Sequence, residues 1–176
     1  LTIERGVFSG NTATTGSGFG AGIFLNRGSA TISDSTFTGN SAGGLGAAVY
    51  NYQTTVAYTG NTFVGNSSTS GGGAIANENA TVTLVNNTIS GNQTSGGSGG
   101  ALYQLGGSTV LTHNTLTENT AGASGGGIYN FLGTVTLRNT IVSGNAAPSG
   151  TECLNDTFSG GTVLTANAHN VLGVSG

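Results

Sequence analysis

Positive charge is almost missing from this sequence, which contains no lysine and only three arginines, Arg5, Arg27 and Arg138. Charged residues of both signs make up 5% of the 176 residues, and the formal net charge is −3. A chain without a basic cluster lacks the electrostatic signature of proteins that bind nucleic acid or anionic membranes. We therefore expect no nucleic acid partner. No run of 18 apolar residues occurs, so we also expect no membrane insertion.

Good helix formers are scarce as well, because methionine and lysine are absent while glycine occurs 34 times. This composition argues against an α-helical domain. The single cysteine, Cys153, has no partner for an internal disulfide. Neither His113 nor His169 lies in a motif that would make it a catalytic base for this thiol, so we expect Cys153 to be structural.

Abundant Gly, Ser, Thr and Asn with little charge is also typical of disordered chains, but a strong repeat argues against disorder. A first motif consists of an apolar residue followed three residues later by asparagine. A second motif is rich in Gly and Ala and ends in an aliphatic residue. Fourteen residues separate each aliphatic residue from the next first-motif apolar residue, as from Ile75 to Ile89. The first-motif asparagines, which are 29, 26, 26, 27 and 26 residues apart, are Asn11, Asn40, Asn66, Asn92, Asn119 and Asn145. The second-motif aliphatic residues are Ile23, Val49, Ile75, Leu102 and Ile128.

Apolar and polar residues alternate over short runs in most repeats, as around Val82 and Leu84, which indicates strands. A constant period with insertions confined to one corner is typical of a solenoid, in which neighbouring repeats share one core. The sequence therefore predicts an all-β, single-stranded parallel β-helix (β-solenoid) of about six coils of ~26 residues. We expect a single domain over residues 1–176, with repeats in 1–145 and an irregular last coil and C-terminal segment in 146–176.

Two amide columns follow from this stacking. The first-motif asparagines are expected to form a structural ladder, because identical amides one coil apart can donate and accept hydrogen bonds along the axis. A second column lies two residues after the aliphatic residues and is expected to be a buried ladder at a bend. Its members are Asn51, Asn77, Gln104 and Asn130.

The alternating FxxN and GGA[I/L/V] motifs resemble the repeats of the chlamydial polymorphic outer membrane proteins. The stretch NTIVSGNAAPSGTECLNDTFSGGTVLTANAHNVLG (139–173) is similar to the last coil of large secreted bacterial proteins with right-handed β-helix repeats. The resemblance implies a right-handed helix and an extracellular or cell-surface (secreted) location. It also implies a role in adhesion, surface display or scaffolding.

Many β-helices are polysaccharide lyases or glycosidases, so an enzyme is an alternative to weigh. Glycoside hydrolysis uses two carboxylates about 5 to 9.5 Å apart, and the only acids close in sequence are Glu152 and Asp156. Calcium needs six or more oxygen ligands, and the sequence has no Asp-rich repeat. We therefore predict no catalytic residues, no metal site, no cofactor and no enzymatic activity.

An aromatic residue directly follows the aliphatic residue in four repeats, and alternation points it away from the core. These residues are Phe24, Tyr50, Tyr103 and Tyr129. An exposed aromatic row is typical of a surface that binds glycans or cell-surface proteins, although the rings can instead stack and stiffen the sheet.

The ends of a solenoid expose unpaired strand edges, so we expect self-association by axial stacking or filament formation. The chain begins at Leu1, partway through a repeat, and we expect a mature product or a fragment. The leading hypothesis is an extracellular structural solenoid, a building block of a surface layer, fibre or adhesin stalk. The alternatives are an adhesin that uses the aromatic stripe, an ice-binding protein with Thr pairs such as Thr81/Thr83, and a polysaccharide lyase or hydrolase.

Overall fold

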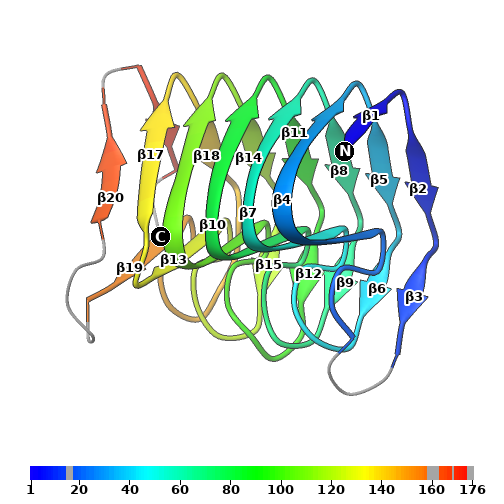
Figure 1. Cartoon of the computed structure of the whole chain (residues 1–176). Helices are drawn as coiled ribbons and strands as arrows, with labels where there is room; N and C mark the ends of the chain where they lie inside the picture. The colour runs from blue at the N-terminus through cyan, green and yellow to red at the C-terminus, as the bar shows by residue number, and fades with distance from the viewer. Residues whose placement is uncertain (15–17, 158–162, 168, 174–176) are drawn as a thin grey trace.

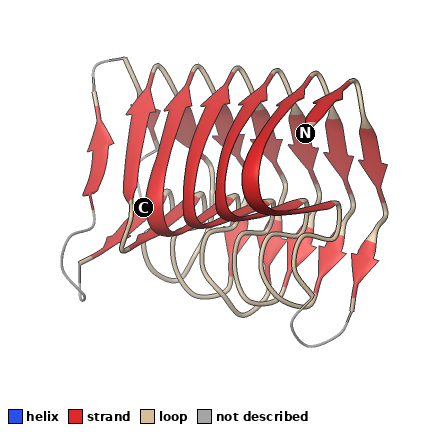
Figure 2. Ribbon diagram, viewed as in Figure 1, coloured by secondary structure: helices blue, strands red, loops and turns tan. Residues whose placement is uncertain are grey.

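The chain winds through three parallel sheets that run side by side along one axis (Figures 1 and 2). The computed structural model describes residues 1–14, 18–157, 163–167 and 169–173, and over these residues it contains strands but no helix. Nothing in this described part is a helix of the length and apolarity needed to cross a membrane. Each of the first five coils gives a strand to the first, second and third sheet in turn, and the chain then returns to the first sheet one layer further along.

The strands of the three sheets follow the repeat. The first sheet contains β1 (Thr2–Glu4), β4 (Ile23–Ser33), β7 (Val49–Thr59), β10 (Ile75–Val85), β13 (Leu102–Thr112), β16 (Ile128–Phe131), β17 (Thr134–Arg138), β19 (Cys153–Asp156) and β20 (Val163–Ala166). The second contains β2 (Val7–Ser9), β5 (Thr36–Thr38), β8 (Thr62–Val64), β11 (Thr88–Ser90), β14 (Thr115–Thr117), β18 (Ile141–Ser143) and β21 (Val171–Leu172). The third contains β3 (Thr12–Ala13), β6 (Ser41–Ala42), β9 (Ser67–Ser68), β12 (Gln93–Thr94) and β15 (Thr120–Ala121).

The register confirms the predicted stacking of like positions. Ile75 pairs with Val49 on one side and with Leu102 on the other, and all three side chains are fully buried. The first-motif apolar residues form a second interior column, in which Phe63 pairs with Phe37 and Ile89. Because each coil is too thin to enclose these side chains alone, the core exists only between neighbouring coils.

Aromatic stacking reinforces the first half of this second column. The Phe37 ring stacks on the rings of Phe8 and Phe63, with centroid distances of 4.7 and 4.8 Å. Parallel pairing places equivalent side chains about 4.8 Å apart, so the strand spacing itself imposes this ring separation. The interior thus continues from coil to coil without an interruption.

Left-handed backbone conformations make the corners of the coil. The residue before each ladder asparagine has a positive φ, and it is glycine in every coil except the fifth, where Glu118 has a φ of 59°. Its counterparts Gly91 and Gly144 have φ values of 61° and 73°. An added Cβ at these two glycines would meet no atom within 4 Å, so the penalty at this corner arises from the backbone conformation and not from crowding.

We expect Glu118→Gly to raise the free energy of unfolding by up to about 1 kcal/mol. The left-handed conformation costs an L-residue about 1–2 kcal/mol, while the greater freedom of unfolded glycine offsets about 0.5–1 kcal/mol. Urea unfolding measures the difference. Glu118→Ala keeps the unfavourable φ and should give no gain, so equal stabilisation by both variants would assign the effect to the lost carboxylate.

The C-terminal segment predicted to be irregular, 146–176, contributes strands to two sheets. Strand β19 pairs with β16, β20 pairs with β17, and β21 pairs with β18. The parallel stack therefore extends beyond the sixth ladder asparagine. The described residues of this segment place Cys153, Glu152 and Asp156 at the end of the solenoid.

Candidate functional site

The asparagine column is an interior hydrogen-bond ladder. In each of the first five coils, the backbone N–H and the Nδ2 group of one asparagine both donate to Oδ1 of the next, as from Asn66 to Asn92 at 2.9 and 2.8 Å. The Nδ2 group of Asn66 also donates to the carbonyl oxygen of Phe37 at 3.0 Å. Asn11 is exposed, whereas the five later members are buried. The four central members, Asn40, Asn66, Asn92 and Asn119, are fully buried and closed to a ligand, whereas Asn145 borders a cavity at the end of the ladder.

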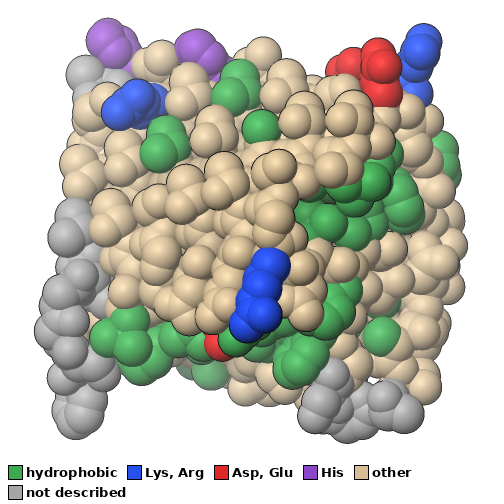
Figure 3. All heavy atoms as spheres, viewed as in Figure 1, with side chains coloured by type: hydrophobic (Ala, Val, Ile, Leu, Met, Phe, Trp, Pro, Cys, Tyr) green, Lys and Arg blue, Asp and Glu red, His purple; other side chains and the backbone are tan. Residues whose placement is uncertain are grey.

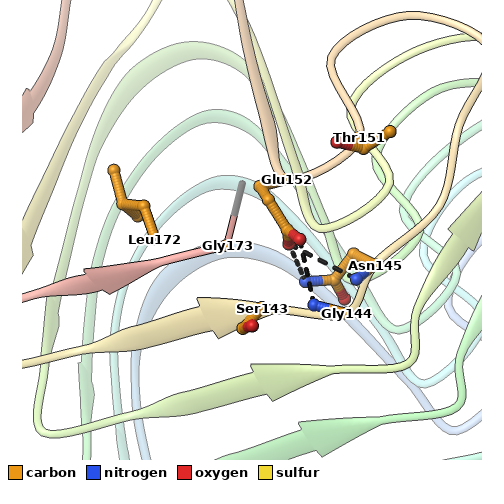
Figure 4. Close-up of a pocket in the computed structure, with 7 residues that line it drawn as sticks. All are labelled: Ser143, Gly144, Asn145, Thr151, Glu152, Leu172 and Gly173. Atoms are coloured by element: carbon orange, nitrogen blue, oxygen red, sulfur yellow. Dashed lines mark hydrogen bonds between the residues drawn. The ribbon is translucent and has the colours of Figure 1, made fainter. Parts of the chain in front are cut away.

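A carboxylate ends the ladder (Figure 4). Oε2 of Glu152 accepts hydrogen bonds from Nδ2 and the backbone N–H of Asn145 at 2.7 and 3.3 Å. Oε1 accepts one from the backbone N–H of Gly144 at 2.9 Å. Glu152 thus supplies the acceptor that an asparagine supplies in every earlier coil. The adjoining cavity of about 570 Å³, lined also by Ser143, Thr151, Leu172 and Gly173, is the space beside this cap.

We expect Glu152→Ala to lower the free energy of unfolding by about 2 kcal/mol, since hydrogen bonds to a charged group contribute about 1.5–3 kcal/mol. Glu152→Gln keeps an oxygen acceptor and should lose less than half as much. Urea unfolding gives the global effect, and hydrogen exchange of the Gly144 and Asn145 amides gives the local one. If both variants exchange at the wild-type rate, Glu152 is not a cap.

The second predicted amide column also lies inside. Asn51 donates from Nδ2 to Oδ1 of Asn77 at 2.7 Å, and Asn77 donates to Oε1 of Gln104 at 3.1 Å. Asn130 donates to Oδ1 of Asn155 at 2.7 Å. The first four members of this column are fully buried. Like the first ladder, the column stabilises a bend.

A third buried column was not predicted from the sequence. Asn61 donates its backbone N–H to Oδ1 of Asn87 at 2.8 Å, and Asn87 donates in the same way to Asn114 at 2.9 Å. Ser35 and Thr140 take this position in the flanking coils. The sequence does contain a signal for this column. Each of these three asparagines lies five residues before a ladder asparagine, in the pattern Asn-Thr-x-x-x-Asn.

The predicted aromatic stripe belongs to a pair of outward columns at the bend of the first sheet. The inner column reads Phe24, Tyr50, Ala76, Tyr103, Tyr129 and Leu154, and the outer column reads Asn26, Tyr52, Glu78, Leu105, Phe131 and Asp156. The space-filling view shows hydrophobic side chains gathered in patches on a face with few charges (Figure 3).

The exposure expected along the stripe is wrong for Tyr50, which is only 4% exposed. Phe19, from the variable corner before β4, stacks on the Tyr50 ring at a centroid distance of 4.8 Å. Phe24 and Tyr52 contact the same ring at 5.2 and 6.5 Å. Phe24 itself remains 48% exposed and Phe19 36% exposed, so the surface presents these two rings with Tyr50 packed between them.

Two carboxylates contact this aromatic surface. Glu78 accepts a hydrogen bond from Oη of Tyr50, and Asp156 accepts one from Oη of Tyr129 at 2.6 Å. Burial, followed by these hydrogen bonds, raises the pKa of both phenols above the ordinary value of 10.0. We call one part of this surface the aromatic–acid site: a depression of about 340 Å³ lined by Phe19, Phe24, Asn26, Tyr50, Tyr52 and Glu78.

Glu152, Asp156, Cys153 and His113 each have separate neighbours in the described part of the chain. Glu152 ends the ladder, while Asp156 binds Tyr129 on the outer face. Cys153 pairs with Ile128 in the aliphatic column. His113 is exposed, with Nε2 3.0 Å from Nδ2 of Asn139. Among the described residues, no three His, Cys, Asp or Glu side chains form a group that could hold a metal ion.

A buried thiol and a buried phenol make the stability of the fold sensitive to high pH. Burial, with a smaller effect of the Glu152 charge, raises the pKa of the Cys153 thiol from 9.0 to about 12. Burial also raises the pKa of Tyr58 above 10.0. Above pH 9 the unfolded chain therefore binds fewer protons than the folded one, and the free energy of unfolding should fall as pH rises. Urea unfolding between pH 8 and 12 measures this slope, which Cys153→Ala should reduce just above pH 9.

Comparison with known proteins gives one match. A family model described as "Right handed beta helix region" matches residues 4–172. Neither the curated proteins nor the solved structures contain a match to the chain. The family match and the parallel stack together confirm the predicted fold and its hand. The bacterial origin and the likeness to the chlamydial proteins stay predictions.

Proposed function

Because the chain belongs to the family of right-handed β-helix regions, we propose that it is an extracellular structural β-solenoid, a building block of a surface layer, fibre or adhesin stalk. The observation that carries this proposal is the continuous interior. Buried amide ladders and a shared apolar core tie every coil to its neighbours. Each coil contacts only the next ones, so the architecture extends in one direction and suits a rod that spans distance.

Axial self-association is part of this proposal. Within the described chain, β1, β2 and β3 each pair on one side only. Leu1, which precedes β1, is 65% exposed, and Val7, the first residue of β2, is 73% exposed. An exposed strand edge is a template for another strand, and a head-to-tail contact of this kind propagates as a fibre.

Electron microscopy and sedimentation of the native protein test the assembly. We expect concentration-dependent filaments or short stacks for the wild type and loss of both for Val7→Lys, because a charge on an edge strand opposes pairing. Val64→Lys places the same charge on β8, which is paired on both sides, and should leave assembly intact. Discrete monomers of the wild type at every concentration would remove the assembly proposal.

A second candidate function is an adhesin, which the aromatic–acid site favours. Exposed rings and a carboxylate converge there on a preformed depression, which is the usual composition of a binding site. Binding to cell surfaces and to a glycan array tests this candidate, with Phe24→Ala in the site and Tyr103→Ala with Tyr129→Ala further along the stripe as variants. We expect no depolymerisation of any polysaccharide, and measurable depolymerisation would favour the enzyme alternative instead.

A further inference from the structure

Neighbouring rings and paired strands hold the side chains of the aromatic–acid site. Phe24 and Tyr52 stand on β4 and β7, which pair with each other in register, and Tyr50 is clamped between the rings of Phe19 and Phe24. The rings that remain accessible are therefore fixed by neighbours and by the sheet. A preformed surface loses little conformational freedom on binding, which favours affinity.

The aromatic–acid site contains one carboxylate, that of Glu78. Glu78 is half-buried, and Tyr50 supplies one hydrogen bond to a carboxylate that can accept about four. The chain has no lysine, and Arg27, which adjoins Asn26, donates from Nε to Oε1 of Gln53 at 3.0 Å. In the described chain, Glu78 forms no ion pair with any cationic side chain.

The electrostatic effect of the acids extends along the stripe. Next to burial, the charges of Glu78 and Asp156 both raise the pKa of Tyr103, which lies between them. The arrangement also recurs: Tyr129 and Phe131 precede Asp156 by one coil just as Tyr50 and Tyr52 precede Glu78. The two acids are three coils apart in one column, about 14 Å at the ordinary strand spacing.

We propose that the aromatic–acid site binds a basic side chain, lysine or arginine, of a partner protein. The faces of aromatic rings carry negative electrostatic potential, so Phe19, Phe24 and Glu78 attract the same sign of charge. The apolar stem of such a side chain packs on the rings while its cationic end meets the carboxylate. This inference rests on the adhesin candidate and names the chemistry of its partner. A neutral glycan has no charge to match Glu78 and is the competing occupant.

Titration of the full chain with a short lysine-containing peptide tests the proposal, followed by calorimetry or tyrosine fluorescence. The matched peptide carries glutamine in place of lysine, and a second matched peptide carries arginine. We expect the two basic peptides to bind and the glutamine peptide to bind at least about tenfold more weakly, since a hydrogen bond to a charged group contributes about one to two powers of ten. Binding should weaken as salt is added.

Two site variants and one control make the result specific. Glu78→Gln keeps an acceptor for Tyr50 and should weaken the lysine peptide about tenfold, while Phe24→Ala should weaken it about two- to fivefold. Asp34→Asn removes an exposed acid from a bend outside the site and should change nothing. Urea midpoints equal to that of the wild type establish that each variant is folded.

The results of these experiments distinguish a failure of the basic-side-chain proposal from a failure of the adhesin candidate. Equal binding by Glu78→Gln, or equal affinity for the glutamine peptide, overturns the basic-side-chain proposal. If the protein still adheres to cells or to a neutral glycan in that case, the adhesin candidate survives with a different ligand. If neither adhesion nor peptide binding is observed, both the adhesin candidate and the inference are wrong.

Discussion

Replacing Asn66 with alanine should lower the free energy of unfolding by at least about 3 kcal/mol. Oδ1 of Asn66 accepts hydrogen bonds from the backbone N–H and Nδ2 of Asn40 at 3.0 and 2.8 Å. Its Nδ2 group donates to Phe37 and Asn92. Alanine removes all four bonds and leaves buried donors and acceptors unsatisfied, each costing about 1–3 kcal/mol. Urea unfolding followed by circular dichroism measures the loss.

Asn11 provides a matched control at the exposed end of the same ladder. Asn11→Ala removes one side-chain donor, while the backbone N–H of residue 11 still donates to Oδ1 of Asn40. We expect a loss of about 0.5–1.5 kcal/mol, the usual contribution of a single hydrogen bond. If Asn66→Ala were no worse than Asn11→Ala, the interior ladder would not be what stabilises this corner.

The fold was predictable because stacked coils require the same type of side chain at the same position of each coil. The aliphatic column from Ile23 to Ile128 and the Phe37–Phe63 column repeat at constant spacing, so their stacking followed from the sequence. The third amide column was missed because its members vary chemically. Ser35 and Thr140 replace asparagine at its ends, so the column does not repeat one residue type in every coil.

The candidate site was less predictable because its geometry depends on contacts between coils. Tyr50 is buried by Phe19, which comes from the corner whose length varies between repeats. Glu78 lies in an outer column of mixed composition, and only the register shows that it lies one coil beyond Tyr52. The role of Glu152 was hidden in the same way, since a glutamate in a loop carries no sequence signal for ending an asparagine ladder.

Phe63→Ala should lower the free energy of unfolding by about 3–5 kcal/mol, the usual loss when a buried phenylalanine is truncated. The side chain is fully buried, stacks on Phe37 at 4.8 Å and contacts the ring of Tyr58 edge-on at 5.8 Å. Alanine would open a cavity between two coils that the sheets cannot close, because their spacing is fixed by backbone hydrogen bonds. Urea and thermal unfolding both measure the effect.

The column itself supplies the control for this prediction. Ile89 and Leu116 hold the equivalent positions in the next two coils, so a branched aliphatic side chain fits this stack. Phe63→Leu leaves a much smaller cavity than alanine does and should therefore lose less than half as much stability. Val64→Ala, on the outward face of the same strand, should be nearly neutral because Val64 is 36% exposed. A loss for Phe63→Ala as small as that for Val64→Ala would mean that neighbouring coils do not depend on a common interior.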